Sequence, residues 1–246
     1  MAFDTYVVPA DVFVPLLVAA YRARKQEIHD PRVAHAVEIL SAWDRRSSKQ
    51  SVAQTYAYFW GRAYQELYSK ARFERFIGYS RYRIDIHSAN EQTDALRALA
   101  RAIDQIPEKS GKADVPWGEV NVVARGGEFP LGGTGLFDVL HPDDGEEQKG
   151  GQIFDNDGWG HMMVVEEGSP KKIWSLLPYG ESENPDSPHY NDMAKLHSRT
   201  EMKRFWFTPQ NILAHTEAVW GSKDRMNGLI EKCGSEPVTC DSKPVQ

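Results

Sequence analysis

The feature that most constrains this chain is a change of hydrophobic period between residues 107 and 114. Before it, apolar residues recur three and four positions apart, which is the spacing of one face of an α-helix. After it, short apolar runs alternate with turns rich in Gly, Asn and Asp, which is typical of β-strands. Helices followed by antiparallel strands indicate the α+β class, in which the helices are segregated from the sheet.

Four stretches in the first part predict helices. The first spans residues 9–28, and the second begins at Pro31, because proline is tolerated in the first helical turn. The third spans 51–76 and carries aromatic residues at helical spacing, which we interpret as core packing. The fourth contains Leu96, Leu99, Ile103 and Ile106, and we expect Pro107 to end it.

The second part predicts an antiparallel meander that ends in a helix. Asn156-Asp157-Gly158 and Gly168-Ser169-Pro170 have turn chemistry and separate neighbouring strands. Thr208 and Pro209 predict the start of a last helix that runs to about Trp220. The apolar runs that predict strands are 120–123, 152–154, 162–165, 173–177 and 205–207.

Charge follows the same division of the chain. Residues 1–110 hold 16 basic and 13 acidic side chains, whereas residues 111–246 hold 13 basic and 22 acidic ones. We therefore expect a mainly helical segment at 1–110, an antiparallel β segment with a final helix at 111–220, and a loose tail at 221–246. Together these segments form one partial domain.

Composition excludes several classes of protein. The net charge of −6 and the pI of about 5.8 argue against a nucleic-acid partner. The most apolar run, Val12–Tyr21, is half the length of a membrane span, and Met1–Asp4 lacks the basic start of a signal peptide. Cys233 and Cys240 could form a small disulfide loop or remain two free thiols.

Several motifs that suggest chemistry have simpler interpretations. Gly126-Gly127 and Gly132–Gly135 lack the spacing of a phosphate-binding loop and fit turns between strands. The stretch Asp155–Glu166 is close to a calcium-binding loop, but Trp159 offers no ligand oxygen and the flanks predict strands, which favours a hairpin turn. We interpret the acidic cluster as a solvated loop; its members are Asp143, Asp144, Glu146 and Glu147.

Ser187, His189 and Asp192 have the side chains of a hydrolytic triad. Residues this close in sequence usually diverge around one turn of chain, so we favour a hydrogen-bonded structural role for His189. Ser182 follows Gly180-Glu181 but lacks the second glycine of a nucleophile elbow.

Three segments near the C-terminus resemble the end of the penicillin acylase family: Pro178–Ser182, Ser187–Asp192, and Phe205–Ile212 with His215. In that family a Gly-Gln-Ser-Gly turn precedes Ser-Pro-His-Tyr-x-Asp-Gln, an apolar strand and a final helix. This chain has Glu181 and Met193 where the family has glutamine. Weaker similarity extends over residues 1–220, at Ala2–Thr5, Leu40–Asp44 and Trp117–Val120.

The resemblance implies a four-layer αββα sandwich and an N-terminal-nucleophile amidohydrolase. Such enzymes mature from a secreted precursor into a small α chain and a large β chain. The β chain begins with Ser, Cys or Thr, whose α-amine titrates near neutral pH and acts as the base. Typical substrates are the side-chain amides of β-lactams, acyl-homoserine lactones and lipopeptides. The resemblance thus predicts a periplasmic or extracellular location.

On this resemblance, the chain is the C-terminal portion of the β chain, and its partners are the upstream part of the β chain and the α chain. The nucleophile and the calcium ligands lie upstream, so no catalytic residue, metal site or cofactor is assigned here. Substrate-binding residues stay open, and the chain alone should be inactive. His189, Tyr190 and Asp192 are expected to fix the packing of the last strand and helix. Internal cleavage could instead expose a nucleophile that follows a glycine: Thr134, Ser169, Ser222 or Ser235.

Two alternatives remain. The chain could be a truncated, non-catalytic descendant that acts as a binding or scaffold protein, which would fold alone and bury the aromatic residues of 56–68. It could also be an accessory piece that completes a separately encoded first half. A mere fragment would instead expose the apolar face meant for the missing sheet.

Overall fold

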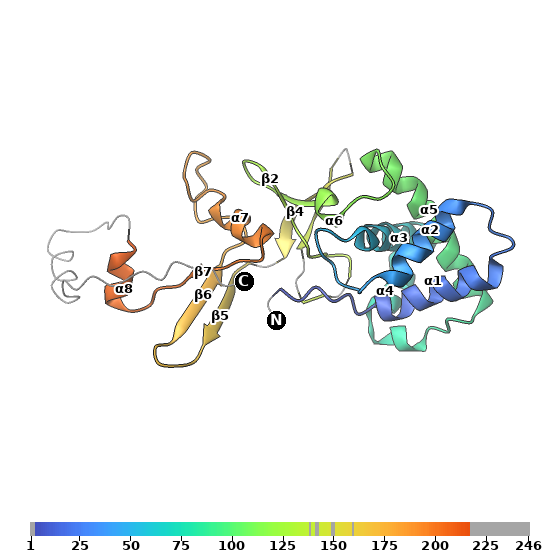
Figure 1. The fold of residues 1–246 in the computed structure, drawn as a ribbon, viewed down its shortest axis with the longest axis horizontal. Coiled ribbons are helices and arrows are strands. Elements are labelled where there is room, and N and C mark those ends of the chain that lie inside the picture. The colour runs from blue at the N-terminus through green and yellow to red at the C-terminus, as the bar shows by residue number, and fades with distance from the viewer. Residues whose placement is uncertain (1–2, 138, 141–142, 149–150, 159, 217–246) are drawn as a thin grey trace.

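The computed structural model describes residues 3–137, 139–140, 143–148, 151–158 and 160–216. Helices gather at one end of the molecule, a four-stranded sheet lies next to them, and a three-stranded sheet and the last helix extend toward the other end (Figure 1). A helical first half followed by strands and a short final helix confirms the α+β class. Within the described ranges, no helix is long and apolar enough to cross a membrane.

The helices of the first half begin where local capping chemistry predicts. Asp30 Oδ1 accepts a hydrogen bond from the Arg32 N–H at 2.9 Å, and Ser51 Oγ accepts one from the Gln54 N–H at 3.0 Å. Pro31 is the first residue of its helix, as predicted. The bounds are α1 Ala10–Arg24, α2 Pro31–Ala42, α3 Val52–Tyr68, α4 Lys70–Ile77, the 3₁₀ turn η1 Tyr79–Arg83, and α5 Ala89–Ser110.

Two helix predictions are wrong in their boundaries. The stretch 51–76 is two helices, because Ser69 adopts φ 96° and its hydroxyl accepts a hydrogen bond from the Arg72 N–H at 3.4 Å, which caps α4. Pro107 does not end α5, which continues to Ser110. Proline has a helical φ, but beyond the first turn it removes one hydrogen bond and crowds the carbonyl four residues before it. Here only three helical residues follow Pro107.

Aromatic side chains of α3 form the centre of the main core. Trp60 and Tyr64 are fully buried. The Trp60 ring stacks on Phe13 of α1 at 4.6 Å between centroids and meets the edge-on ring of Phe76 of α4 at 5.3 Å. Its indole N–H donates to the carbonyl of Ala95 in α5 at 3.1 Å. One tryptophan therefore joins four helices, which confirms the interpretation of this aromatic stripe as core.

The first sheet differs from the predicted meander. Its strand order is β2-β1-β4-β3, and β1 and β4 run parallel, with Asn121 opposite Ile153. Parallel neighbours cannot be joined by a tight hairpin, so turn chemistry does not reveal this pair. The short helix α6 Trp117–Val120 leads into the sheet. The strands are β1 Asn121–Ala124, β2 Glu128–Pro130, β3 Asp143–Glu147 and β4 Ile153–Gly158.

The second sheet is the predicted antiparallel meander, in the order β5-β6-β7. Gly168-Ser169-Pro170 connects β5 to β6 as expected, whereas Asn156-Asp157-Gly158 lies in β4 and does not form the predicted turn. The last strand ends at Arg204, so the prediction of a strand at 205–207 is wrong. The strands are β5 Met162–Glu166, β6 Lys172–Leu176 and β7 Lys203–Arg204.

The second part also contains two short helices: α7 Asp192–Ser198 lies between β6 and β7, and α8 Pro209–Ala214 follows β7. Thr208 Oγ1 accepts a hydrogen bond from the Asn211 N–H at 3.3 Å, and Pro209 is the first helical residue, so the predicted start of α8 is confirmed. The helix ends at Ala214, earlier than expected. The predictions for Trp220 and for the tail, including Ser222, Ser235, Cys233 and Cys240, fall outside the described residues.

Candidate functional site

Residues 178–192, here called the motif loop, fold around the side chain of Arg125, which directly follows β1. The Arg125 Nε donates to the Tyr190 carbonyl at 2.6 Å, and its Nη2 donates to the Ser182 carbonyl at 3.0 Å. The guanidinium carbon lies 4.3 Å from the centroid of the Tyr190 ring. The Arg125 side chain is only 19% exposed. One arginine thus bonds to both arms of this loop, at Ser182 and at Tyr190. Such charge-assisted hydrogen bonds are stronger than neutral ones.

The motif loop is also closed on itself. The Ser182 N–H donates to the His189 carbonyl at 3.2 Å, and Asn191 Nδ2 donates back to the Arg125 carbonyl at 2.9 Å. Gly180 has φ 156°, and a Cβ at that position would lie 2.4 Å from the His189 carbonyl oxygen. A glycine is therefore required where the two arms of the loop meet.

The three triad candidates are close together, but not in the arrangement of a triad. His189 Nδ1 lies 2.9 Å from Asp192 Oδ2. The Ser187 Oγ accepts a hydrogen bond from the main-chain N–H of His189 at 3.2 Å. In a hydrolytic triad the serine hydroxyl donates to the imidazole instead. These contacts join the motif to Arg125 and to the first turn of α7. The sequence predicts instead a contact with the last helix, which is α8.

The two departures from the family motif both connect the motif loop to its surroundings. Glu181 Oε1 lies 2.5 Å from Lys203 Nζ in β7. Met193 is buried at the start of α7, and its Sδ accepts a hydrogen bond from the Leu177 N–H at 3.2 Å. Glu181 therefore joins the motif loop to β7, and Met193 joins α7 to the residue that follows β6.

A second polar cluster is buried between α6, β1, β3 and α7 and was not predicted. Asp143 Oδ2 accepts a hydrogen bond from the Gly133 N–H at 2.8 Å, and Asp143 Oδ1 lies 3.5 Å from His197 Nε2. The Gly133 carbonyl accepts hydrogen bonds from the Trp117 indole at 2.7 Å and the Asn121 amide at 3.1 Å. The prediction of a solvated loop is therefore wrong for Asp143, which lies buried in β3.

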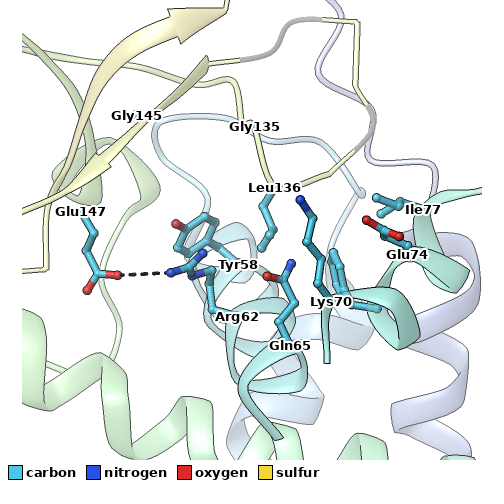
Figure 2. Close-up of a pocket in the computed structure, with 11 residues that line it drawn as sticks. Tyr58, Arg62, Gln65, Lys70, Glu74, Ile77, Gly135, Leu136, Gly145 and Glu147 are labelled. Carbon is cyan, nitrogen blue, oxygen red and sulfur yellow. Dashed lines mark ion pairs between the residues drawn. The ribbon is translucent and has the colours of Figure 1, made fainter. Parts of the chain in front are cut away.

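A cavity of about 510 Å³ lies between α3, α4 and the segment 135–147 (Figure 2). Its lining mixes apolar side chains such as Phe73 and Leu136 with charged ones such as Lys70. Arg62 reaches Glu147 across one side at 3.9 Å. Among the described residues that line the cavity there is no serine, threonine or cysteine, which are the nucleophiles used in acyl transfer.

The glycine-preceded candidates for an exposed nucleophile lie in different environments. Thr134 is fully buried in the segment between β2 and β3. Ser169 is exposed in the β5–β6 hairpin, where a cis peptide bond joins it to Pro170. The structure does not bring the two together with His189.

The calcium-loop interpretation does not match the backbone. Asp155 and Asp157 lie in β4, which is extended, and Asp155 Oδ2 accepts a hydrogen bond from the Tyr179 hydroxyl at 3.1 Å. Among the residues that the structure describes, no three His, Cys, Asp or Glu side chains are placed to hold a metal ion.

The amino-acid sequence matches the model of a known family over most of the chain. The family model of penicillin amidase matches residues 1–214. This chain belongs to the penicillin amidase family.

Curated relatives share part of this sequence. An acyl-homoserine lactone acylase, PvdQ, from Pseudomonas syringae pathovar tomato is 28% identical over 130 residues, which is 50% of this chain and 17% of the relative. PvdQ from pathovar syringae is 27% identical over 126 residues, which is 49% of this chain and 16% of the relative. The matched part of the chain thus spans about one sixth of the length of these relatives.

Proposed function

We propose that this chain supplies the C-terminal part of the β chain of a periplasmic acylase, and that the complete enzyme cleaves the amide of an acyl-homoserine lactone. The observation that carries the proposal is the family match over residues 1–214, together with similarity to two acyl-homoserine lactone acylases. The side-chain amides of β-lactams and of lipopeptides are the other substrates of the same class.

In the proposed reaction, a Ser, Thr or Cys at the start of the β chain attacks the amide carbonyl carbon. Its own α-amine takes the proton from the attacking group and passes it to the departing amine. Water then attacks the acyl-enzyme, which releases a carboxylic acid and restores the nucleophile. Hydrogen-bond donors near the nucleophile stabilise the oxyanion in both steps.

The role proposed for this chain is structural. The Arg125 side chain donates to the Tyr190 carbonyl, and the Arg125 carbonyl accepts from the Asn191 side chain, so the motif loop is held to the residue that follows β1. His189 is occupied by Asp192, and the Ser187 hydroxyl by the main chain. These contacts support a role in holding the sheet and α7 in place, without direct participation in chemistry.

The test begins with the DNA upstream of the Met1 codon. We expect the reading frame to continue upstream through a Gly-Ser, Gly-Thr or Gly-Cys processing junction and a secretion signal. The complete protein should release homoserine lactone from acyl-homoserine lactones of varied chain length, and a variant with alanine at the junction nucleophile should not. Purified chain 1–246 should release none. Release by this chain alone would show that it carries its own nucleophile.

A second function, a non-catalytic binding or scaffold protein, is favoured by one observation. The aromatic residues Tyr56, Phe59, Trp60 and Tyr64 are buried within the chain's own helices. A stop codon and ribosome-binding site directly before Met1, with a monomeric chain in size-exclusion chromatography and light scattering, would support this alternative. Soluble aggregate would support the fragment of an acylase.

A further inference from the structure

Strand β5 has an unusual surface for a strand at the end of a sheet. Four consecutive residues, Met162 to Val165, are apolar. Successive side chains in a strand point to opposite faces. Met163 is nevertheless 48% exposed, Val164 39% and Val165 46%. Exposed apolar side chains therefore occur on both faces of the same strand.

The outer backbone edge of β5 lies at the end of the three-stranded sheet. Among the described residues, β5 pairs with β6 alone, in regular register from Met162 opposite Leu176 to Glu166 opposite Lys172. Natural edge strands are usually protected by charge, proline, a bulge or a covering segment. The run Met162–Val165 has no charge and no proline, and the pairing shows no bulge. A continuous apolar strand is typical of the interior of a sheet that is covered on both faces.

We propose that the outer edge of β5 binds a β-strand from the part of the acylase that precedes this chain, which continues the three-stranded sheet. This inference rests on the proposed function. The matched relatives have enough chain for that strand, because the alignment covers only 17% of one and 16% of the other. The partner strand is predicted to be apolar and uncharged opposite Met162–Val165, since a buried unpaired charge there would destabilise the pairing.

The position of β5 in the molecule agrees with such a partner. The β5–β6 hairpin extends away from the helices α1–α5, so these helices do not cover it (Figure 1). Its buried end, Met162, packs with Leu176, Met193 and Met202 in a small core cluster. One end of β5 is thus packed in the core, whereas Met163, Val164 and Val165 remain exposed.

The experiment compares hydrogen exchange of the β5 amides in chain 1–246 and in the complete protein translated from the extended reading frame. We expect the β5 amides that do not bond to β6 to exchange about 100-fold more slowly in the complete protein. Val164→Lys should reduce this protection. The matched control is Tyr79→Lys, at an η1 residue that is 92% exposed, and it should leave the protection unchanged.

Other occupants give different results. Protection already present in chain 1–246, lost when residues 217–246 are removed, would assign the edge to the chain's own tail. Protection that rises with concentration together with a dimeric mass would assign it to a second copy. Each overturns the proposal, as does a complete protein in which β5 exchanges as fast as in the isolated chain.

These failures are distinguishable from failure of the proposed function. A complete protein that hydrolyses acyl-homoserine lactones but leaves β5 unprotected contradicts the strand pairing alone. A complete protein that protects β5 but hydrolyses no amide contradicts the proposed function alone. A stop codon directly before Met1 contradicts both, because no strand then precedes β5 in the same reading frame.

Discussion

The helical region, residues 3–120, and the three-stranded sheet differ in how completely they bury their apolar surface. In the helical region, rings such as Trp60 and Phe76 are fully enclosed by neighbouring helices. In the three-stranded sheet, Met163, Val164 and Val165 are exposed, and the core beneath is a small methionine-rich cluster.

The difference follows from how each element satisfies its backbone. A helix forms its hydrogen bonds internally and needs neighbours only along one apolar stripe. A strand bonds to its neighbours, so the outer strands of a sheet carry unpaired backbone N–H and C=O groups that natural proteins protect. A chain that contains a whole group of helices but only part of a larger sheet would therefore bury its apolar surface in the helical region. It would leave apolar surface exposed in the sheet.

The largest effect is expected at Trp60. Trp60→Ala removes a ring that contacts α1 and α4 and the hydrogen bond to α5. We expect the free energy of unfolding of the helical region to fall by about 3–5 kcal/mol, measured by urea titration with circular dichroism at the helical band. Tyr79→Ala, at an exposed ring, should change it by less than about 0.5 kcal/mol. Equal effects of the two variants would mean that the helical core is not closed.

Arg125→Ala tests the connection between the first sheet and the motif loop. It removes two charge-assisted hydrogen bonds to carbonyls. We expect the free energy of local opening at residues 178–192 to fall by about 2–4 kcal/mol in hydrogen exchange, with no change in α3. Arg83→Ala, at an exposed arginine of η1, serves as control. An unchanged motif loop would show that Arg125 does not hold it.

Tyr56→Phe tests burial in the helical region through pH. The phenol donates to Asp114 at 3.1 Å, and burial, followed by the Asp114 charge, raises the pKa of Tyr56 above its ordinary value of 10.0. Because the unfolded chain loses this proton at lower pH than the folded chain, stability falls as pH rises above about 10. Tyr56→Phe should be about 1 kcal/mol less stable at neutral pH but lose less stability between about pH 8 and 11. An identical alkaline loss in both proteins, by urea titration, would contradict this account.

The smallest effect is expected at Glu181. Glu181→Gln restores the residue that the family motif has and removes the contact with Lys203. Since both side chains are substantially exposed, we expect a loss of less than about 1 kcal/mol at low salt and no loss at about 1 M salt. A larger, salt-independent loss in urea titration would show that this pair has a role beyond a surface ion pair.

Features that are determined by a few neighbouring residues could be predicted from the sequence. Asp30 with Pro31, and Thr208 with Pro209, carry capping information within a few residues, and both helices begin there. Strands and strand pairings that depend on distant contacts could not be predicted. The parallel pairing of β1 with β4 has no turn signal, and β3 consists of residues with weak strand preference.

The candidate site shows the same limit. The motif around His189 is visible in the sequence, but Arg125 lies 65 positions before Tyr190, and nothing near it indicates that partner. In the sequence, Asp143 is one of several neighbouring acidic residues, which predicts a solvated loop. It is buried because α7 brings His197 next to it and the backbone of Gly133 donates to it. A hydrophobic pattern cannot report such polar contacts across segments.

The most direct test of the contrast between the two regions is native-state hydrogen exchange on chain 1–246 alone. The account predicts that the amides of α3 and α5 exchange slowest, near the rate set by global unfolding, and that those of β5, β6 and β7 exchange at least about 100-fold faster. Equal protection of the helices and the three-stranded sheet would contradict it, because the sheet would then be complete without a further strand.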